Sequence, residues 1–283
     1  MTTLRRLNRD ASMTNDDQTK QEVRKVFDRI ANREDWERLY AGAPNRLTYN
    51  FISRQRAVEE MLACIRLGQV LELGCGTGDL SPFLMERASG YTGVDISEAM
   101  IERARANYGR QIGTGRARFE VGDCERLQFG DASFEMVVAV ALIEYLPDPS
   151  KALDEMRRVL KPGGHCLITV PNRRCLNRVA RALFAPVRWL LFPLYVRMTG
   201  RRLADMKDVK HFAYTREELE VMMGTRGFQW SDCGFSNFYF LMHPLDHVVP
   251  GLYMRLSEWA DRSGHGERFR LLAANYNALF CKQ

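Results

Sequence analysis

Residues 70–80, VLELGCGTGDL, place three glycines at alternate positions directly after an apolar run. An apolar strand, a glycine-rich turn and a helix form the first unit of a nucleotide-binding α/β domain, where the backbone approaches a ligand closely. The dinucleotide fingerprint G-x-G-x-x-G would need glycine at position 79, but Asp79 stands there and the third glycine is Gly78. The stretch therefore indicates a nucleotide-binding fold and argues against NAD or FAD as its ligand.

Four further strand patterns follow this loop. YTGVDIS (91–97) ends near Asp95, about twenty residues beyond the loop, where an acidic side chain can accept hydrogen bonds from ribose hydroxyls. RFEVGDCERLQF (118–129) puts Asp123 at the end of a third strand, and DASFEMVVAVALIEYLPDP (131–149) predicts a fourth. KALDEMRRVLKPGGHCLITVP (151–171) predicts an amphipathic helix, a Lys-Pro-Gly-Gly turn and a fifth strand.

In this order and at this spacing, the segments resemble the class I S-adenosylmethionine-dependent methyltransferases of the type 11 and type 25 small-molecule branch, over residues 20–283. The resemblance rests on ELGCGTG, VDIS, GDCERLQF, FEMVVAVALIEYL and LKPGGHCLITVP. It implies an α/β Rossmann-like fold with a seven-stranded, mostly parallel sheet, helices on both faces, an antiparallel last strand and helical insertions. It also implies S-adenosyl-L-methionine as cofactor and methyl transfer as the reaction.

The same resemblance assigns a cofactor-binding set. The glycine loop would approach the amino acid part of the cofactor, Asp95 would hold the ribose hydroxyls, and Asp123 would face the adenine amino group. Alternatively, Asp95 and Asp123 each merely start a helix or a turn. The predicted cofactor-binding residues are Arg54, Glu72, Gly74, Cys75, Gly76, Gly78, Asp95, Ile96, Asp123 and Cys124.

Three residues are candidates for catalysis. Glu144 and Tyr145 follow the fourth strand, and His211 ends the first insertion. An alcohol or phenol acceptor needs a base during methyl transfer, whereas a neutral amine can attack directly. The alternatives are that Glu144 is a helix-start carboxylate and Tyr145 a pocket wall.

No metal site is predicted. LIEYLPDP resembles the quinone-biosynthesis O-methyltransferases, where E-x-x-E-H can hold a metal, but the matching positions here are Ala141, Glu144 and Tyr145. His243 and His247 have the spacing of helical zinc ligands, yet Pro244 between them disfavours one continuous helix.

The positive charge is concentrated between residues 173 and 210. This stretch has eight arginines and two lysines against two aspartates, a net charge of +8 within a chain of net charge +6. Its apolar run at 182–196 is too short and too interrupted to span a bilayer, which needs roughly 20 apolar residues. The segment is either a helical cap on the core or a surface that meets an anionic membrane, and its apolar residues disfavour a nucleic-acid groove.

The chain divides into a disordered tail at 1–17 and a methyltransferase domain at 18–283. Within the domain we expect an N-terminal helical cap at 18–66, a cofactor-binding core at 67–170, the apolar-basic insertion at 171–214, and a C-terminal part at 215–283 with a second insertion at 241–268. The helix pattern over 19–42 puts Val23 and Phe27 on one face, and in relatives such a helix folds over the cofactor. A sixth strand is predicted within 228–242 and a seventh within 270–282.

Composition indicates a globular, reduced, cytoplasmic protein. Of 283 residues, 46% are hydrophobic and 27% charged, and the seven cysteines form no C-x-x-C pair. Without a secretory apolar region, we expect the cytoplasm, with the basic segment able to meet the inner face of the membrane.

The expected acceptor is a hydrophobic small molecule, and O-methylation of a lipid-, quinone- or polyketide-like hydroxyl is favoured over N-methylation. A protein that binds the cofactor without catalysis, as a partner or regulatory subunit, is the alternative from another class.

Overall fold

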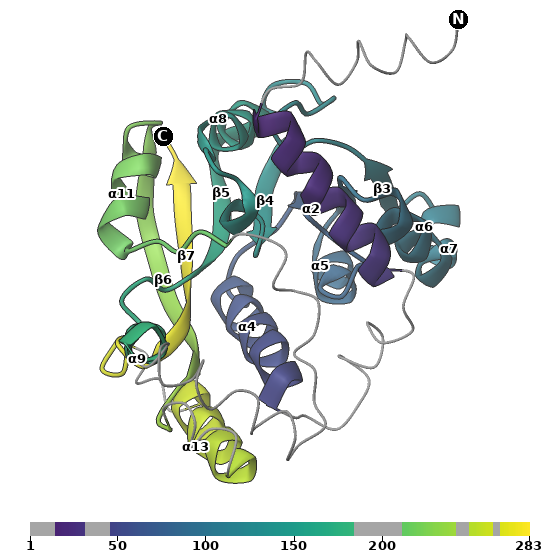
Figure 1. The fold of residues 1–283 in the computed structure, drawn as a ribbon. Helices are drawn as coiled ribbons and strands as arrows, with labels where there is room; N and C mark the ends of the chain where they lie inside the picture. Colours follow the sequence, from purple (N-terminus) through teal and green to yellow (C-terminus); the bar gives the residue numbers. More distant parts are fainter. Residues whose placement is uncertain (1–14, 32–45, 184–210, 242–248, 263–266) are drawn as a thin grey trace, which may run out of the picture.

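The computed structural model describes residues 15–31, 46–183, 211–241, 249–262 and 267–283. A seven-stranded sheet with the order β3-β2-β1-β4-β5-β7-β6 runs through the molecule (Figure 1). The five strands from β3 to β5 are parallel, and β7 is antiparallel to both β5 and β6. The predicted fold class is thus confirmed. The strands are β1 Gln69–Leu73, β2 Gly90–Asp95, β3 Ala117–Val121, β4 Phe134–Val140, β5 Leu160–Pro171, β6 Phe228–Phe238 and β7 Ala273–Lys282.

Helices cover both faces of the sheet and bury two apolar clusters. One cluster joins α4 (Arg46–Leu62), α5 (Ser81–Arg87) and α6 (Glu98–Asn107) to the sheet. The other joins α8 (Ser150–Val159) and α11 (Arg216–Gly224) to the opposite face. Side chains alternate between faces along a strand, which is why Val70 belongs to the first cluster and Leu71 to the second. The remaining helices are α2 (Asn15–Ala31), α7 (Gly109–Gly113), the 3-10 turn η1 (Ile143–Tyr145), α9 (Leu176–Leu183) and α13 (Pro250–Arg262).

Polar side chains fix where several helices begin. Thr215 and Glu218 form a capping box at α11, in which each side chain bonds the other residue's backbone N–H. Ser97 caps α6 by accepting a hydrogen bond from the backbone of Met100. The Ser97 cap, two residues after the end of β2, starts α6.

Two predicted boundaries differ from the structure. Helix α2 begins at Asn15, inside the stretch expected to be a disordered tail. The Lys-Pro-Gly-Gly turn lies within β5, as an irregularity between the pairs Phe134–Leu160 and Met136–His165. Gly163, with φ +73°, provides the left-handed conformation that this excursion needs.

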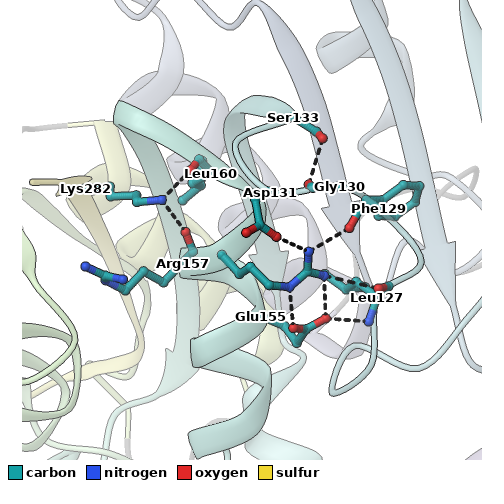
Figure 2. Close-up of polar contacts among 10 residues, drawn as sticks. Leu127, Phe129, Gly130, Asp131, Ser133, Glu155, Arg157, Leu160 and Lys282 are labelled. Carbon is teal, nitrogen blue, oxygen red and sulfur yellow. Dashed lines mark hydrogen bonds and ion pairs between the residues drawn. The ribbon is translucent and has the colours of Figure 1, made fainter.

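Arg158 ties α8 to the connection that precedes β4. Its guanidinium binds both oxygens of Glu155 at 2.7 and 2.8 Å and the carboxylate of Asp131 at 2.8 Å. It also donates to the carbonyl oxygens of Phe129 and Leu127 (Figure 2). Glu155 in turn accepts from the backbone N–H of Leu127. One planar side chain on α8 therefore holds three groups of an otherwise irregular segment.

Replacing Arg158 with alanine is expected to destabilise the protein by about 1–3 kcal/mol, because two backbone carbonyls and two carboxylates lose their donor. Arg157→Ala is the matched control, since Arg157 is an exposed neighbour on the same helix. Urea unfolding measures both changes. Equal effects of the two substitutions would contradict the assigned role of Arg158.

Candidate functional site

A pocket lies at the carboxyl ends of β1, β2 and β4, where open α/β sheets bind their ligands. The glycine loop and the end of β2 form its floor, and α2 and α4 contribute walls. Nine of the ten predicted cofactor-binding residues line it: Arg54, Glu72, Gly74, Cys75, Gly76, Asp95, Ile96, Asp123 and Cys124. Residues that were predicted from separate motifs therefore surround the same pocket.

The glycines of the loop share positive φ values but differ in their surroundings. Gly74, Gly76 and Gly78 all have positive φ values, of 70°, 53° and 87°. A Cβ added at Gly76 would meet no atom within 4 Å, so the backbone there faces open space. A Cβ at Gly78 would instead lie 2.6 Å from the ring of Tyr108, whose hydroxyl donates to the Gly78 carbonyl. Gly78 thus packs behind the loop and is not among the residues that line the pocket.

Asp95 joins the loop to the start of α6. Its Oδ2 accepts from the backbone N–H of Gly76 and its Oδ1 from that of Ser97, both at 2.9 Å. Burial raises the pKa of Asp95, while these two N–H groups oppose the shift. The carboxylate is held in one orientation at the pocket.

Glu72 is a buried carboxyl group beneath the glycine loop. The hydroxyl of Tyr91 donates to its Oε2 at 2.5 Å, and Ser81 lies 2.7 Å from that hydroxyl. Burial raises the pKa of Glu72 to about 8, and the nearby Asp79 and Asp95 add to the shift. Near neutral pH, Glu72 is therefore largely protonated.

This shift makes stability depend on pH. The unfolded chain releases the Glu72 proton near pH 4.5 and the folded protein only near 8, so stability falls as pH rises between these values. Glutamine does not titrate, so in Glu72→Gln the free energy of unfolding should fall less between pH 5 and 8 than in the wild type. We expect the difference to be about 2–4 kcal/mol, because a shift of one pKa unit corresponds to about 1.4 kcal/mol. Urea unfolding between pH 5 and 8 measures it, with the exposed Glu86→Gln as control. Parallel profiles for Glu72→Gln and the wild type would refute this prediction.

Lys20 is a pocket residue that sequence analysis missed. It reaches from α2 to Asp123 at 2.9 Å and to Glu125 at 2.5 Å. Burial alone would lower the pKa of Lys20, but the hydrogen bonds to Glu125 and Asp123 raise it overall. A lysine in a polar helix stretch carries no local signal of this contact, because its partners lie about a hundred residues away.

Helix α2 covers the pocket, as the resemblance implied for the N-terminal helix. Val23 and Phe27 line the cavity, and the Phe27 ring meets Tyr145 edge-on at 5.3 Å. Ser97 donates to Asp28 at 2.6 Å, which joins α2 to the first turn of α6. From α4, Arg54 lies over the ring of Phe51 at 5.5 Å, and both residues line the pocket.

The three catalytic candidates lie together. His211 Nδ1 is 3.3 Å from Glu144 Oε1, and the rings of His211 and Tyr145 are 4.8 Å apart. The backbone N–H of Phe212 donates to the carbonyl of Glu144, so the segment that carries His211 runs beside η1. Tyr145 lines the pocket, and His211 lies against the Tyr145 ring next to that lining.

Glu144 and His211 differ in how far their side chains are exposed. The Glu144 side chain is 6% exposed and that of His211 29%, so the imidazole is the accessible member of the pair. Glu144 Oε2 is buried and has no hydrogen-bond partner among the described residues. An Nδ1–H of His211 can donate to Glu144, which leaves Nε2 as the free proton acceptor.

The turn after β4 is strained. Ala141, a pocket residue, has φ +51°, and its N–H donates to Thr169 Oγ1 on β5 at 2.9 Å. A non-glycine residue in this region costs about 1–2 kcal/mol and persists where its surroundings hold it. This turn directs Leu142 and Tyr145 toward the pocket.

Several predictions fall outside the described residues. These include His243, His247 and residues 184–210 of the basic insertion. Across the residues that the structure covers, no helix has the length and apolar character to cross a membrane.

Comparison with known proteins identifies one family. A family model described as "Methyltransferase domain" matches residues 71–168. The ubiquinone/menaquinone biosynthesis C-methyltransferase UbiE of Geobacter sulfurreducens is 30% identical over 217 residues, 73% of this chain and 80% of that protein. The O-methyltransferase cnsE of Penicillium expansum is 33% identical over 151 residues, 50% of this chain and 54% of that protein.

Solved structures share the fold at low sequence identity. Magnesium protoporphyrin IX methyltransferase (ChlM) from Synechocystis PCC 6803 with bound S-adenosylmethionine has a TM-score of 0.61 at 15% identity, covering 96% of this chain and 99% of that one. The methyltransferase in the Haloferax volcanii Trm112 complex has a TM-score of 0.59 at 18% identity, over 90% and 96% of the two chains.

Proposed function

Because the chain belongs to the class I S-adenosylmethionine-dependent methyltransferases, we propose that its acceptor is a hydrophobic small molecule bearing a hydroxyl group, of the lipid, quinone or polyketide kind. Transfer to the hydroxyl oxygen is the favoured reaction. The acceptor class is supported by the apolar pocket wall of Phe27, Phe51 and Leu142, together with a base suited to a hydroxyl.

The residues around the pocket fit S-adenosylmethionine. The backbone at Gly76 faces open space, and the oriented carboxylate of Asp95 suits a pair of ribose hydroxyls. We assign Asp95 to the ribose, Asp123 and Cys124 to the adenine, and Glu72, Gly74, Gly76 and Arg54 to the amino acid end. Bound there, S-adenosylmethionine supplies a methyl group activated by its positively charged sulfur.

The observation that carries the proposed reaction is the contact between Glu144 and His211. Glu144 holds the imidazole in one orientation, because its buried side chain is directed at Nδ1. Nε2 of His211 then takes the proton of the acceptor hydroxyl during transfer. Tyr145 lies against both Phe27 and His211, so it joins the pocket wall to this base.

Carbon methylation is the second candidate, since the matched UbiE protein is named a C-methyltransferase. Removing the proton from a phenolic hydroxyl also activates the neighbouring ring carbon, and after methyl transfer that carbon loses its own proton to restore the aromatic ring. The same Glu144–His211 pair would therefore serve either product, and the acceptor's position in the pocket would decide between them.

The test is methyl transfer from isotope-labelled S-adenosylmethionine to a prenylated hydroquinone, an alkylphenol and an aniline of matched size. We expect label on the two hydroxyl compounds, and magnetic resonance of the product distinguishes a methoxy group from a ring methyl. Labelling of the aniline in preference to both hydroxyl compounds would overturn the proposed acceptor class.

A further inference from the structure

One end of the molecule combines exposed apolar side chains with arginines. Helices α9 and α13 lie at this end, near the end of β6 and the start of β7 (Figure 1). Leu183 is 73% exposed and Trp259 53%, both high values for side chains of this kind. The exposed apolar residues there are Leu176, Val179, Leu183, Leu252, Trp259 and Leu271, which we call the apolar end.

Contacts link α9 and α13 to the segment before β7. The backbone N–H of Leu176 donates to the carbonyl of Leu271 at 2.7 Å, which fixes α9 beside the segment before β7. Phe269 in that segment lies 5.7 Å from the ring of Trp259, and Phe240 lies 6.1 Å from it. Trp259 is therefore supported from behind by two aromatic rings while its other side faces solvent.

Among the residues that the structure describes, positive side chains around the apolar end outnumber their acidic partners. Glu258 pairs with Arg262 at 2.7 Å, Glu267 with Arg216 at 3.3 Å, and the buried side of Asp261 accepts from Tyr49 and Ser53. Every acidic side chain that the structure describes on α9, α13 and residues 267–272 thus has a partner. In contrast, Arg178, Arg255 and Arg268 are exposed and have no ion pair with any described residue.

We propose that the apolar end docks this protein onto the surface of an anionic lipid membrane. Leucine side chains and a tryptophan ring would enter the boundary between headgroups and acyl chains, and the three arginines would meet lipid phosphates. On α13, a shallow groove bounded by Arg255, Glu258, Trp259 and Arg262 lies on this surface, where a headgroup can rest.

Two other occupants fit less well. A second copy in a two-fold interface would bring the same unpaired arginines together, which is unfavourable once they are desolvated. A nucleic acid would meet Leu252, Leu183 and Leu271, whose aliphatic side chains offer neither charge nor stacking. Membrane docking needs only the exposed residues and is independent of the proposed acceptor.

Flotation of the full chain with vesicles tests the proposal without any methyl acceptor. One set of vesicles is phosphatidylcholine alone, and the other contains equal parts of phosphatidylcholine and phosphatidylglycerol. We expect flotation with the anionic vesicles only, decreasing as salt is added. The double variant Arg255→Gln/Arg268→Gln should bind roughly tenfold more weakly or worse, and Leu252→Ser/Trp259→Ser should lose binding.

The matched controls are Arg118→Gln on β3 and Val221→Ser on α11, both exposed and away from the apolar end, and they should bind as the wild type does. Failure of the wild type to bind, equal binding to both vesicle types, or unchanged binding by both double variants would overturn the proposal. So would light scattering that shows a dimer dissociated by Leu252→Ser/Trp259→Ser, because the surface would then join two copies.

Discussion

Replacing His211 with glutamine is expected to lower turnover by about 10²–10⁴-fold, the contribution that a positioned general base makes. His211 is the accessible member of the Glu144–His211 pair, and glutamine keeps the polarity of the side chain but cannot take up a proton. Because neither residue lines the pocket, the affinity for S-adenosylmethionine should remain within a few-fold of the wild-type value. Single-turnover kinetics and calorimetry measure the two quantities separately.

Glu144→Gln should reduce turnover less than His211→Gln, since it removes the orienting charge but leaves the imidazole. His165→Gln is the matched control, because His165 lies in β5 well before the carboxyl end of the strand. Turnover that survives in His211→Gln, or an equal loss in His165→Gln, would exclude His211 as the base.

Asp95→Asn is expected to weaken S-adenosylmethionine binding by about 100-fold, or ~2.7 kcal/mol, the value of one or two charge-assisted hydrogen bonds. The amide would also place N–H groups against the backbone N–H of Gly76 or Ser97, which would disturb the glycine loop itself. Calorimetry of the variant measures the loss, and thermal unfolding without ligand confirms that it is folded.

Glu102→Gln is the control for Asp95, since it removes one exposed charge from α6 without touching the pocket. Wild-type affinity in Asp95→Asn would refute the assignment of Asp95 to the ribose. A loss of affinity in both variants would indicate a general effect of charge.

The strand ends that carry Asp95 and Cys124 could be predicted from sequence, because strand periodicity and the glycine loop are local patterns. Gly78 shows the limit of a motif. A glycine in this loop can adopt positive φ, as Gly78 does. Its place outside the pocket lining depends on contact with Tyr108, thirty residues further along the chain.

Long-range contacts could not be predicted in this way. His211 and Glu144 are 67 residues apart in the chain. Their side chains come together where the backbone N–H of Phe212 donates to the carbonyl of Glu144. Lys20 reaches Asp123 across 103 residues. The exposed stripe of α13 could not be distinguished by sequence from a buried one, since Leu252 and the buried Tyr253 are neighbours on one amphipathic helix.

The most direct test of the proposed base compares two acceptors of similar shape in the wild type and in His211→Gln. One is a phenol that is protonated at the assay pH, and the other carries electron-withdrawing groups and is already ionised. We expect a large loss of turnover in His211→Gln with the first acceptor and nearly none with the second, which has no proton to give up. An equal loss with both acceptors would contradict it, because His211 would then act on binding or structure and not on the proton.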